Sequence, residues 1–137
     1  MASWLVKTEP NEYSYADLER DGPSEWDGVK NAQAQIHLRG MQVGDVVVVY
    51  HSGGVRAAIG MARVVRAPYP DPTDPAGKRV WVDFQAERVL GRPVTLAELR
   101  ADPGFATSPL IRISRLSVMP LEESQLSTIE RLAGSPA

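Results

Sequence analysis

The chain has 137 residues, of which 43% are hydrophobic and 23% charged, with a formal net charge of −2 and no cysteine. This length predicts a single domain, spanning residues 1–137, with a core of its own. The lack of cysteine excludes disulfides and thiolate chemistry. No apolar run approaches the roughly 20 residues of a membrane-spanning helix, and no secretory signal is found. We therefore expect a cytoplasmic monomer with no membrane partner.

Charge also bears on nucleic acid. A slightly acidic chain has no overall basic field, which argues against a protein that coats long stretches of DNA or RNA. A local basic face can still form, because several cations fall in the first half of the chain: Lys7, Lys30, Arg39, Arg56, Arg63 and Arg66. The simpler interpretation of these side chains is an ordinary solvated surface.

The first half of the chain predicts two helices and three strands. Residues 4–8 are apolar and β-branched, which favours a strand that stops before Pro10. Ser14 and Asn31 are suited to cap helices, the second running to Gly40 with Ala32 and Ile36, and also Ala34 and Leu38, as its apolar positions. Residues 46–50 predict a strand buried on both faces, and residues 55–66 a longer one in which Gly60 marks a bulge or a close approach.

In the second half, residues 68–78 contain four prolines and predict an exposed loop. A strand should follow over 79–90, with an irregularity near Glu87. Thr95 and Glu98 form a capping-box pattern that starts a short helix. Residues 115–119 predict a last strand ended by Pro120, and residues 121–132 a closing amphipathic helix. These elements together indicate an α+β domain built on a small β-barrel with short helices packed around it.

Catalytic motifs are weak. His37 and His51 are the only histidines, and His51 precedes Ser52. Adjacent residues of a strand point to opposite faces, so these two side chains cannot easily act together. No pattern of metal ligands is present, and the glycine pairs lack the context of a phosphate-binding loop. We therefore expect neither a metal nor another cofactor.

A more distinctive pattern is the set of aromatic and polar residues at the ends of structured segments. Trp26 lies in a predicted loop, shortly before Asn31 and Gln33. An aromatic ring combined with amide, carboxylate and hydroxyl groups is how proteins hold an unstacked base. The other such groups follow the two buried strands: Lys7, Thr8 and Glu9 at the end of the first, and Tyr50, His51 and Ser52 at the end of the second. The alternative is that Trp26 simply closes the edge of the core.

Several of these segments together resemble the EVE domain. They are Trp4-Leu-Val-Lys-Thr-Glu-Pro10, Tyr13-Ser14, Trp26-Asp-Gly-Val-Lys-Asn31, Gln33-Ala34, Leu38-Arg39, Gly44-Asp45, Tyr50-His-Ser52, Ala67-Pro-Tyr-Pro-Asp71 and Arg115-Leu-Ser-Val118. The resemblance runs from Trp4 to about Leu132, nearly the whole chain. Because several linked motifs occur in the same order, it is specific.

This resemblance implies a PUA-like fold and a non-catalytic module that binds a modified base, either a cytosine derivative in DNA or a modified base in RNA. By position, the pocket would be formed by Lys7, Thr8, Glu9, Trp26, Asn31, Gln33, Tyr50, His51 and Ser52. In this interpretation Trp26 is the stacking wall, and Glu9, Asn31 and Ser52 read the edge of the base. Gln33 either faces the pocket or caps the helix.

The chain also departs from the family pattern. Ala32 replaces an aromatic residue, Gln35-Ile36 replaces Arg-Asn, and Ile113 replaces a basic residue. The loss of two cations reduces the attraction for phosphates, which weakens the case for duplex or long-strand binding more than the case for base recognition. It favours a ligand as small as a free nucleoside, or a different modification.

Two other functions stay open at the sequence level. One is an enzyme that acts on modified bases, with His51 as the acid or base and Glu9 as its partner. The other is a protein or RNA interaction module with a vestigial pocket.

Overall fold

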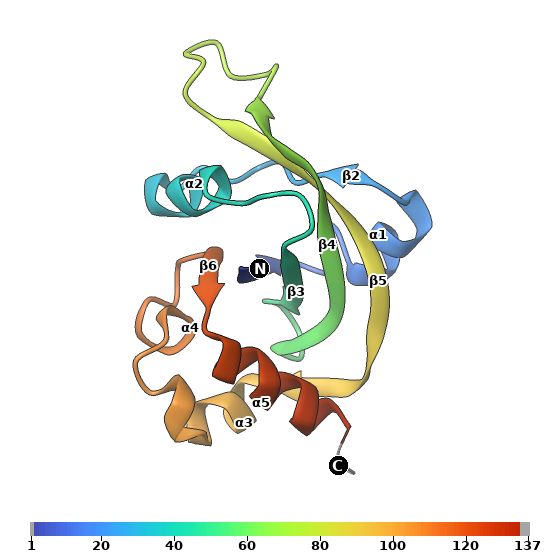
Figure 1. The fold of residues 1–137 in the computed structure, drawn as a ribbon, viewed down its shortest axis with the longest axis vertical. Coiled ribbons are helices and arrows are strands. Elements are labelled where there is room, and N and C mark those ends of the chain that lie inside the picture. Colours follow the sequence, from blue (N-terminus) through green and yellow to red (C-terminus); the bar gives the residue numbers. More distant parts are fainter. Residues whose placement is uncertain (1, 135–137) are drawn as a thin grey trace.

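The computed structural model describes residues 2–134, which form one mixed sheet surrounded by short helices (Figure 1). The strands are β1 (Ser3–Thr8), β2 (Ser24–Glu25), β3 (Val46–His51), β4 (Ala57–Pro70), β5 (Val80–Thr95) and β6 (Val118–Leu121). The helices are α1 (Tyr15–Asp21), α2 (Ala32–Arg39), α3 (Leu96–Ala101), α4 (Pro109–Arg112) and α5 (Glu123–Ala133), with a short 3₁₀ turn, η1 (Pro103–Phe105). None of the helices within residues 2–134 is long and apolar enough to cross a membrane.

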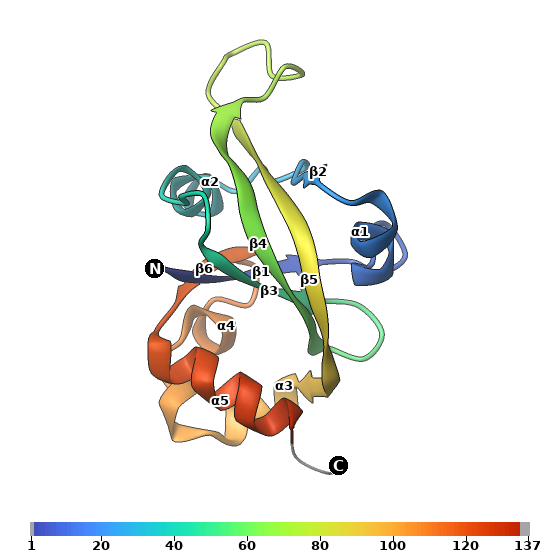
Figure 2. The ribbon, with the colours of Figure 1, turned by 45° about the vertical axis from the view of Figure 1, so that its right-hand side comes forward.

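The six strands form one sheet in the order β2-β5-β4-β3-β1-β6. β1 pairs with β3 in parallel, and all other neighbouring strands are antiparallel. β2 and β6 are the two edges, so among the described residues the hydrogen bonding does not close the predicted small barrel. The long β4–β5 hairpin extends beyond the body of the molecule, whereas α3, α4 and α5 lie together at its other end (Figure 2).

The centre of the sheet forms the core. Val47, Val48 and Val49 of β3 are fully buried, as are Leu5 and Val6 of β1 beside them. The prediction of a strand buried on both faces is therefore confirmed. Burying these side chains supplies the hydrophobic driving force that holds the two strands in parallel register.

Three predicted helix starts are confirmed. The side chains of Ser14, Asn31 and Thr95 accept hydrogen bonds from backbone N–H groups in the first turns of α1, α2 and α3. Thr95 forms the predicted capping box with Glu98. Each cap satisfies a backbone donor that the helix itself leaves free.

Other predictions are wrong in detail. Ala32 and Ile36 face solvent, with Ile36 62% exposed, whereas Ala34 and Leu38 are buried. The reason is that α2 turns Gln35 inward, which moves the buried face away from Ile36. β4 continues to Pro70, so the loop between β4 and β5 covers only residues 71–79. The last strand begins at Val118, and Pro120 lies within it, opposite Trp4 at the sheet edge.

The close approach predicted at Gly60 is confirmed, since the ring of Tyr15 packs directly on its backbone. A Cβ atom on Gly60 would lie 2.3 Å from the ring of Tyr15. That ring is buried, and its hydroxyl donates to the carbonyl of Met61 at 2.7 Å. Gly60 therefore lets α1 pack directly on the sheet, next to a register shift in the β3–β4 and β4–β5 pairings.

We predict that Gly60→Ala lowers the free energy of unfolding by about 2–3 kcal/mol or more, because the methyl group has no space beside Tyr15. Urea unfolding followed by circular dichroism measures this. The matched control is Gly134→Ala, where the nearest atom to the new methyl group is 3.7 Å away and the change should stay within about 0.5 kcal/mol. Equal stability of the two variants would contradict the role given to Gly60.

Candidate functional site

A pocket of about 510 Å³ opens beside the C-terminal end of β1. Four of the residues predicted from the sequence line it, namely Lys7, Thr8, Glu9 and Trp26. The remaining lining residues are Glu12, Tyr13, Asp21, Ser24, Glu25, Asp27, Gly28, Val29 and Ser117. The pocket is thus built from the end of β1, the turn after it, β2 with the segment that follows, and the residue before β6.

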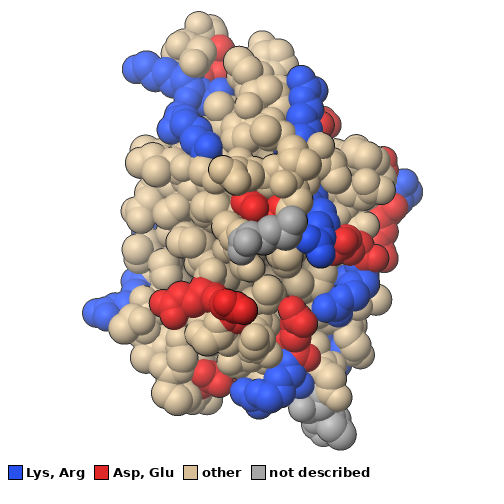
Figure 3. Space-filling view, viewed as in Figure 1, with Lys and Arg blue, Asp and Glu red and all other residues tan. Residues whose placement is uncertain are grey.

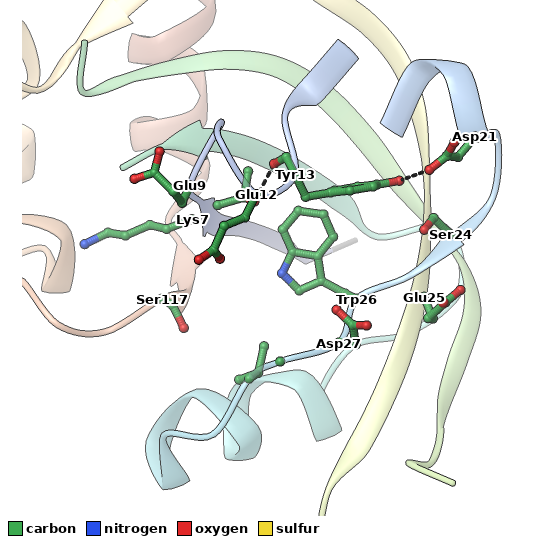
Figure 4. Close-up of a pocket in the computed structure, with 13 residues that line it drawn as sticks. Lys7, Glu9, Glu12, Tyr13, Asp21, Ser24, Glu25, Trp26, Asp27 and Ser117 are labelled. Carbon is green, nitrogen blue, oxygen red and sulfur yellow. Dashed lines mark hydrogen bonds between the residues drawn. The ribbon is translucent and has the colours of Figure 1, made fainter. Parts of the chain in front are cut away.

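The turn after β1 has a defined conformation. The hydroxyl of Thr8 donates to the carbonyl of Tyr13 at 2.6 Å. The backbone N–H groups of Glu12 and Tyr13 both donate to the carbonyl of Glu9, at 2.9 and 2.8 Å. These bonds fold residues 9–13 into a compact turn, and this turn presents Glu12 and Tyr13 to the pocket (Figure 4).

Trp26 is attached to the sheet on one side and contacts the pocket on the other. Its backbone N–H donates to the carbonyl of Val82 at 2.8 Å. Its ring packs against Phe84, with centroids 5.3 Å apart, and edge-to-face against Tyr13, at 6.1 Å. The side chain is only 6% exposed, so it belongs to the core as well as to the pocket wall.

The indole N–H of Trp26 is a free donor. Within residues 2–134 it has no hydrogen-bond partner, although the buried indole of Trp4 donates to Asp45 at 3.0 Å. Figure 4 shows the indole nitrogen of Trp26 turned toward the pocket, in the direction of Glu12. The nitrogen is not among the buried unpaired polar atoms of residues 2–134, so it is accessible and can donate to a ligand in place of water.

The pocket is acidic. Five carboxylates line it, from Glu9, Glu12, Asp21, Glu25 and Asp27, against the one ammonium of Lys7. Asp21 accepts from the hydroxyl of Tyr13 at 2.8 Å, and Glu9 accepts from the backbone N–H of Asn11 at 3.2 Å. In the described part of the chain, Glu12 and Asp27 have no side-chain hydrogen-bond partner. Such a pocket offers acceptors and repels anions.

Lys7 lies at the border between the pocket and β3. Its ammonium group donates to the carbonyl of Ser114 at 3.0 Å and lies 5.8 Å from the ring centroid of Tyr50. Burial, together with the positive charge of Arg56, lowers the pKa of Lys7. Burial raises the pKa of the Tyr50 hydroxyl.

The other predicted residues do not line this pocket. Tyr50 and His51 pair with Lys7 and Thr8 in the parallel ladder, so they lie next to the site, and Tyr50 is buried. Ser52 donates its backbone N–H to the carbonyl of Thr8 at 3.0 Å. Asn31 uses its side-chain oxygen to cap α2, accepting from Ala34 at 3.0 Å. Gln33 is exposed on that helix. Ligand contacts by all nine residues stay predictions.

Sequence reasoning missed most of the acidic residues of the pocket. Asp27 adjoins Trp26, and Tyr13 is part of a quoted motif, so both were within reach of a local argument. Ser117 also belongs to one of the family motifs, Arg115-Leu-Ser-Val118, whereas Glu12 has no local signal, because it reaches the pocket only through the turn after β1.

His51 has a structural contact that the sequence did not suggest. Its Nε2 accepts a hydrogen bond from the backbone N–H of Tyr15, the first residue of α1, at 3.1 Å. Only the neutral ring can accept this bond, and burial lowers the pKa of His51, with a smaller opposing effect from Glu9. The lone pair that an acid–base catalyst would need is therefore already used. No group of three or more His, Asp or Glu side chains within residues 2–134 is arranged to hold a metal ion.

We predict that acid weakens the fold through this contact. Because the pKa of His51 is lower in the folded than in the unfolded chain, the unfolded chain binds protons more strongly near pH 6.5. The contribution of the neutral His51 ring to the free energy of unfolding is complete above about pH 7. It is lost as the pH falls through about 6.5 toward 5. Urea unfolding at several pH values measures it.

The matched variants are His51→Gln and His37→Gln, since burial also lowers the pKa of His37. Each should remove its own part of the pH dependence, and the double variant most of it. A wild-type stability that does not change between pH 7 and 5 would contradict this role of His51.

The fold and site together define a mixed six-stranded sheet with short helices and with an aromatic and acidic pocket at the end of its central strands. A family model described as the EVE domain matches residues 2–132. Human thymocyte nuclear protein 1 is 31% identical over 160 residues, covering 92% of this chain and 71% of that protein. The zebrafish protein of the same name is 32% identical over 161 residues, covering 92% and 69%.

Solved structures agree. A protein from Rhodopseudomonas palustris, solved by NMR, is 39% identical with a TM-score of 0.92, over 98% of this chain and 94% of that one. A crystal structure shows human THYN1 protein in complex with 5-methylcytosine-containing DNA. Its protein chain has 26% sequence identity to the present chain and a TM-score of 0.92, with 100% of both chains covered. The present chain therefore belongs to the EVE domain family.

Proposed function

We propose that this protein is a non-catalytic module that binds one modified cytosine of DNA in the pocket at Trp26. The observation that carries the proposal is the free indole N–H inside a pocket that is otherwise rich in acceptors. Support comes from membership of the EVE family and from the 5-methylcytosine-containing DNA bound to human THYN1. The whole chain is proposed to form this one domain, with the PUA-like fold that the family resemblance implies.

The chemistry of the pocket fits a cytosine edge. The exocyclic amino group of cytosine is a donor, which carboxylates such as Glu12 and Asp27 accept well. The carbonyl oxygen and ring nitrogen of cytosine are acceptors, and the indole N–H of Trp26 can donate a hydrogen bond to one of them. The ring of Tyr13 and the side chain of Val29 add apolar surface where a methyl group can pack.

Negative charge in the pocket also limits what enters it. A phosphodiester close to five carboxylates is repelled, so the base enters and its phosphates stay outside. A base inside a duplex cannot reach such a pocket without leaving the stack, which is least costly for a single-stranded or weakly paired base. RNA and free nucleosides carry the same base edge and are tested beside DNA.

We predict that the protein binds an oligonucleotide carrying one 5-methylcytosine more tightly than the same strand with plain cytosine. The double variant Glu12→Gln/Asp27→Asn should weaken binding about tenfold or more, because hydrogen bonds to charged groups contribute about 1.5–3 kcal/mol. Both side chains are exposed and lack hydrogen-bond partners among residues 2–134, so the fold should not change. Fluorescence anisotropy measures the affinities.

Trp26→Phe keeps an aromatic ring in the core and removes only the N–H donor and part of the ring. It should also weaken binding. The matched control is Glu123→Gln on α5, away from this pocket, which should bind like the wild type. Equal affinity for modified and plain strands, unchanged in all variants, would refute the proposal. Mass spectrometry of the oligonucleotide after incubation with the protein tests for catalysis, which a change in the mass of the base would indicate.

A further inference from the structure

A second pocket of about 290 Å³ lies against the first. The two share the segment Asp27, Gly28 and Val29, which forms the wall between them. The second pocket is completed by Lys30, Gln35, Asp71, Thr73, Arg79 and Trp81. It thus combines two cations, two carboxylates (Asp27 and Asp71) and a half-buried aromatic side chain, whereas the first pocket has five carboxylates and one cation.

Gln35 holds this wall in place. It is 4% exposed, and its amide nitrogen donates to the carbonyl of Val29 at 2.7 Å. Its amide oxygen accepts from the backbone N–H of Val80 at 2.9 Å. One buried side chain therefore ties the segment before α2 to the start of β5. Lys30 follows Val29 in the chain and Arg79 precedes Val80, so these two hydrogen bonds bring both cations to the same pocket.

The loop that carries Arg79 is also held by hydrogen bonds. The carboxylate of Asp74 accepts from the backbone N–H groups of Lys78 and Arg79, both at 2.8 Å. Asp71 accepts from the backbone N–H and hydroxyl of Thr73, at 2.7 and 2.6 Å. The two acidic groups are thus engaged with the loop itself, and the cations project from a defined turn.

The cations of this region make no ion pair among residues 2–134, although Arg79 lowers the pKa of the nearby Asp74 carboxyl, first through its backbone N–H and to a smaller extent through its charge. In the described part of the chain, Lys30, Lys78 and Arg79 make no ion pair, whereas Arg88 pairs with Glu130 and Arg131 with Asp102 at the other end of the molecule. Arg39 adds a further positive charge, its guanidinium donating to the carbonyl of Lys78. Figure 3 shows Lys and Arg side chains gathered over the end of the β4–β5 hairpin.

We propose that this second pocket, with the loop above it, binds the sugar–phosphate backbone of the DNA strand whose base occupies the first pocket. Lys30 and Arg79 contact phosphates beside the extruded nucleotide, and Trp81 packs on the neighbouring sugar or base. This inference rests on the proposed function. It is motivated by Lys30 and Arg79, which lie on the far side of the shared wall without an ion pair to any described residue, and by the repulsion between phosphates and the five carboxylates of the first pocket.

The test compares salt dependence. The variant Lys30→Ala/Arg79→Ala is measured against Arg88→Ala/Arg131→Ala, which removes the same charge far from both pockets. Anisotropy titrations use a single strand with one 5-methylcytosine at several salt concentrations, and a second series uses the free nucleoside 5-methyl-2′-deoxycytidine. We expect the first variant to bind the strand about tenfold more weakly at 0.1 M salt. Its slope of log affinity against log salt should fall by about 1.4, or about 0.7 for each lost contact with a single strand.

In the same variant, affinity for the free nucleoside should be unchanged, because the base pocket is intact. Trp81→Ala should weaken strand binding without changing the salt slope, since stacking is not ionic. An unchanged slope in Lys30→Ala/Arg79→Ala, or an equal loss in the Arg88 and Arg131 variant, would overturn the inference while leaving the proposed function standing. Failure of the wild type to bind either the modified strand or the nucleoside would instead refute the proposed function.

Discussion

The backbone N–H of Trp26 donates to the carbonyl of Val82, directly after the two residues of β2 pair with Phe84 and Asp83 of β5. This very short ladder fixes the start of the segment that forms the pocket wall. The ring of Phe84 packs under the indole, so the side chain is held by the same strand as its backbone. Because β5 is paired with β4 along most of its length, the wall shares the rigidity of the sheet. Binding groups supported in this way lose little entropy when a ligand arrives.

The distribution of charge divides the site into two parts. A nucleotide combines a neutral base, rich in hydrogen-bonding groups, with an anionic backbone, and these need opposite surroundings. The carboxylates of the first pocket suit the amino edge of a base and repel phosphate, whereas Lys30 and Arg79 lie on the other side of the shared wall. Under the proposed function, specificity would come partly from repulsion, since a nucleotide that enters with its phosphate first is disfavoured. The net charge of −2 conceals this separation, because acidic and basic groups cancel over the whole chain.

The parts of the fold that depend on near neighbours could be predicted from the sequence. Helix caps at Ser14 and Asn31 involve residues within one turn, and the buried strand β3 shows in its run of valines. The buried face of α2 could not be predicted in this way. It is decided by Gln35, whose partners are the carbonyl of Val29 and the distant N–H of Val80. The same holds for the site: the end of β1 and Trp26 were found from local patterns, while Glu12 depends on a turn with no clear signal.

Trp26 combines the two interpretations that the sequence left open, since it both closes the core and lines the pocket. With Phe84 on one side and Tyr13 edge-on, little of the ring is exposed. A base that accepts a hydrogen bond from the indole N–H lies at the edge of the ring and leaves Tyr13 in place, whereas a base that stacks on the ring face has to displace Tyr13. Tyr13 is the more exposed neighbour, since it is half-buried whereas Phe84 is fully buried, and its hydroxyl is held by hydrogen bonds with the side chains of Asp21 and Ser24. Breaking two such bonds costs about 1–3 kcal/mol, and stacking contributes about 1–3 kcal/mol per base. The energy of stacking on the indole face is therefore about equal to the cost of moving Tyr13, which favours binding at the N–H edge of the indole, where Tyr13 and the attachment of Trp26 to β5 stay unchanged.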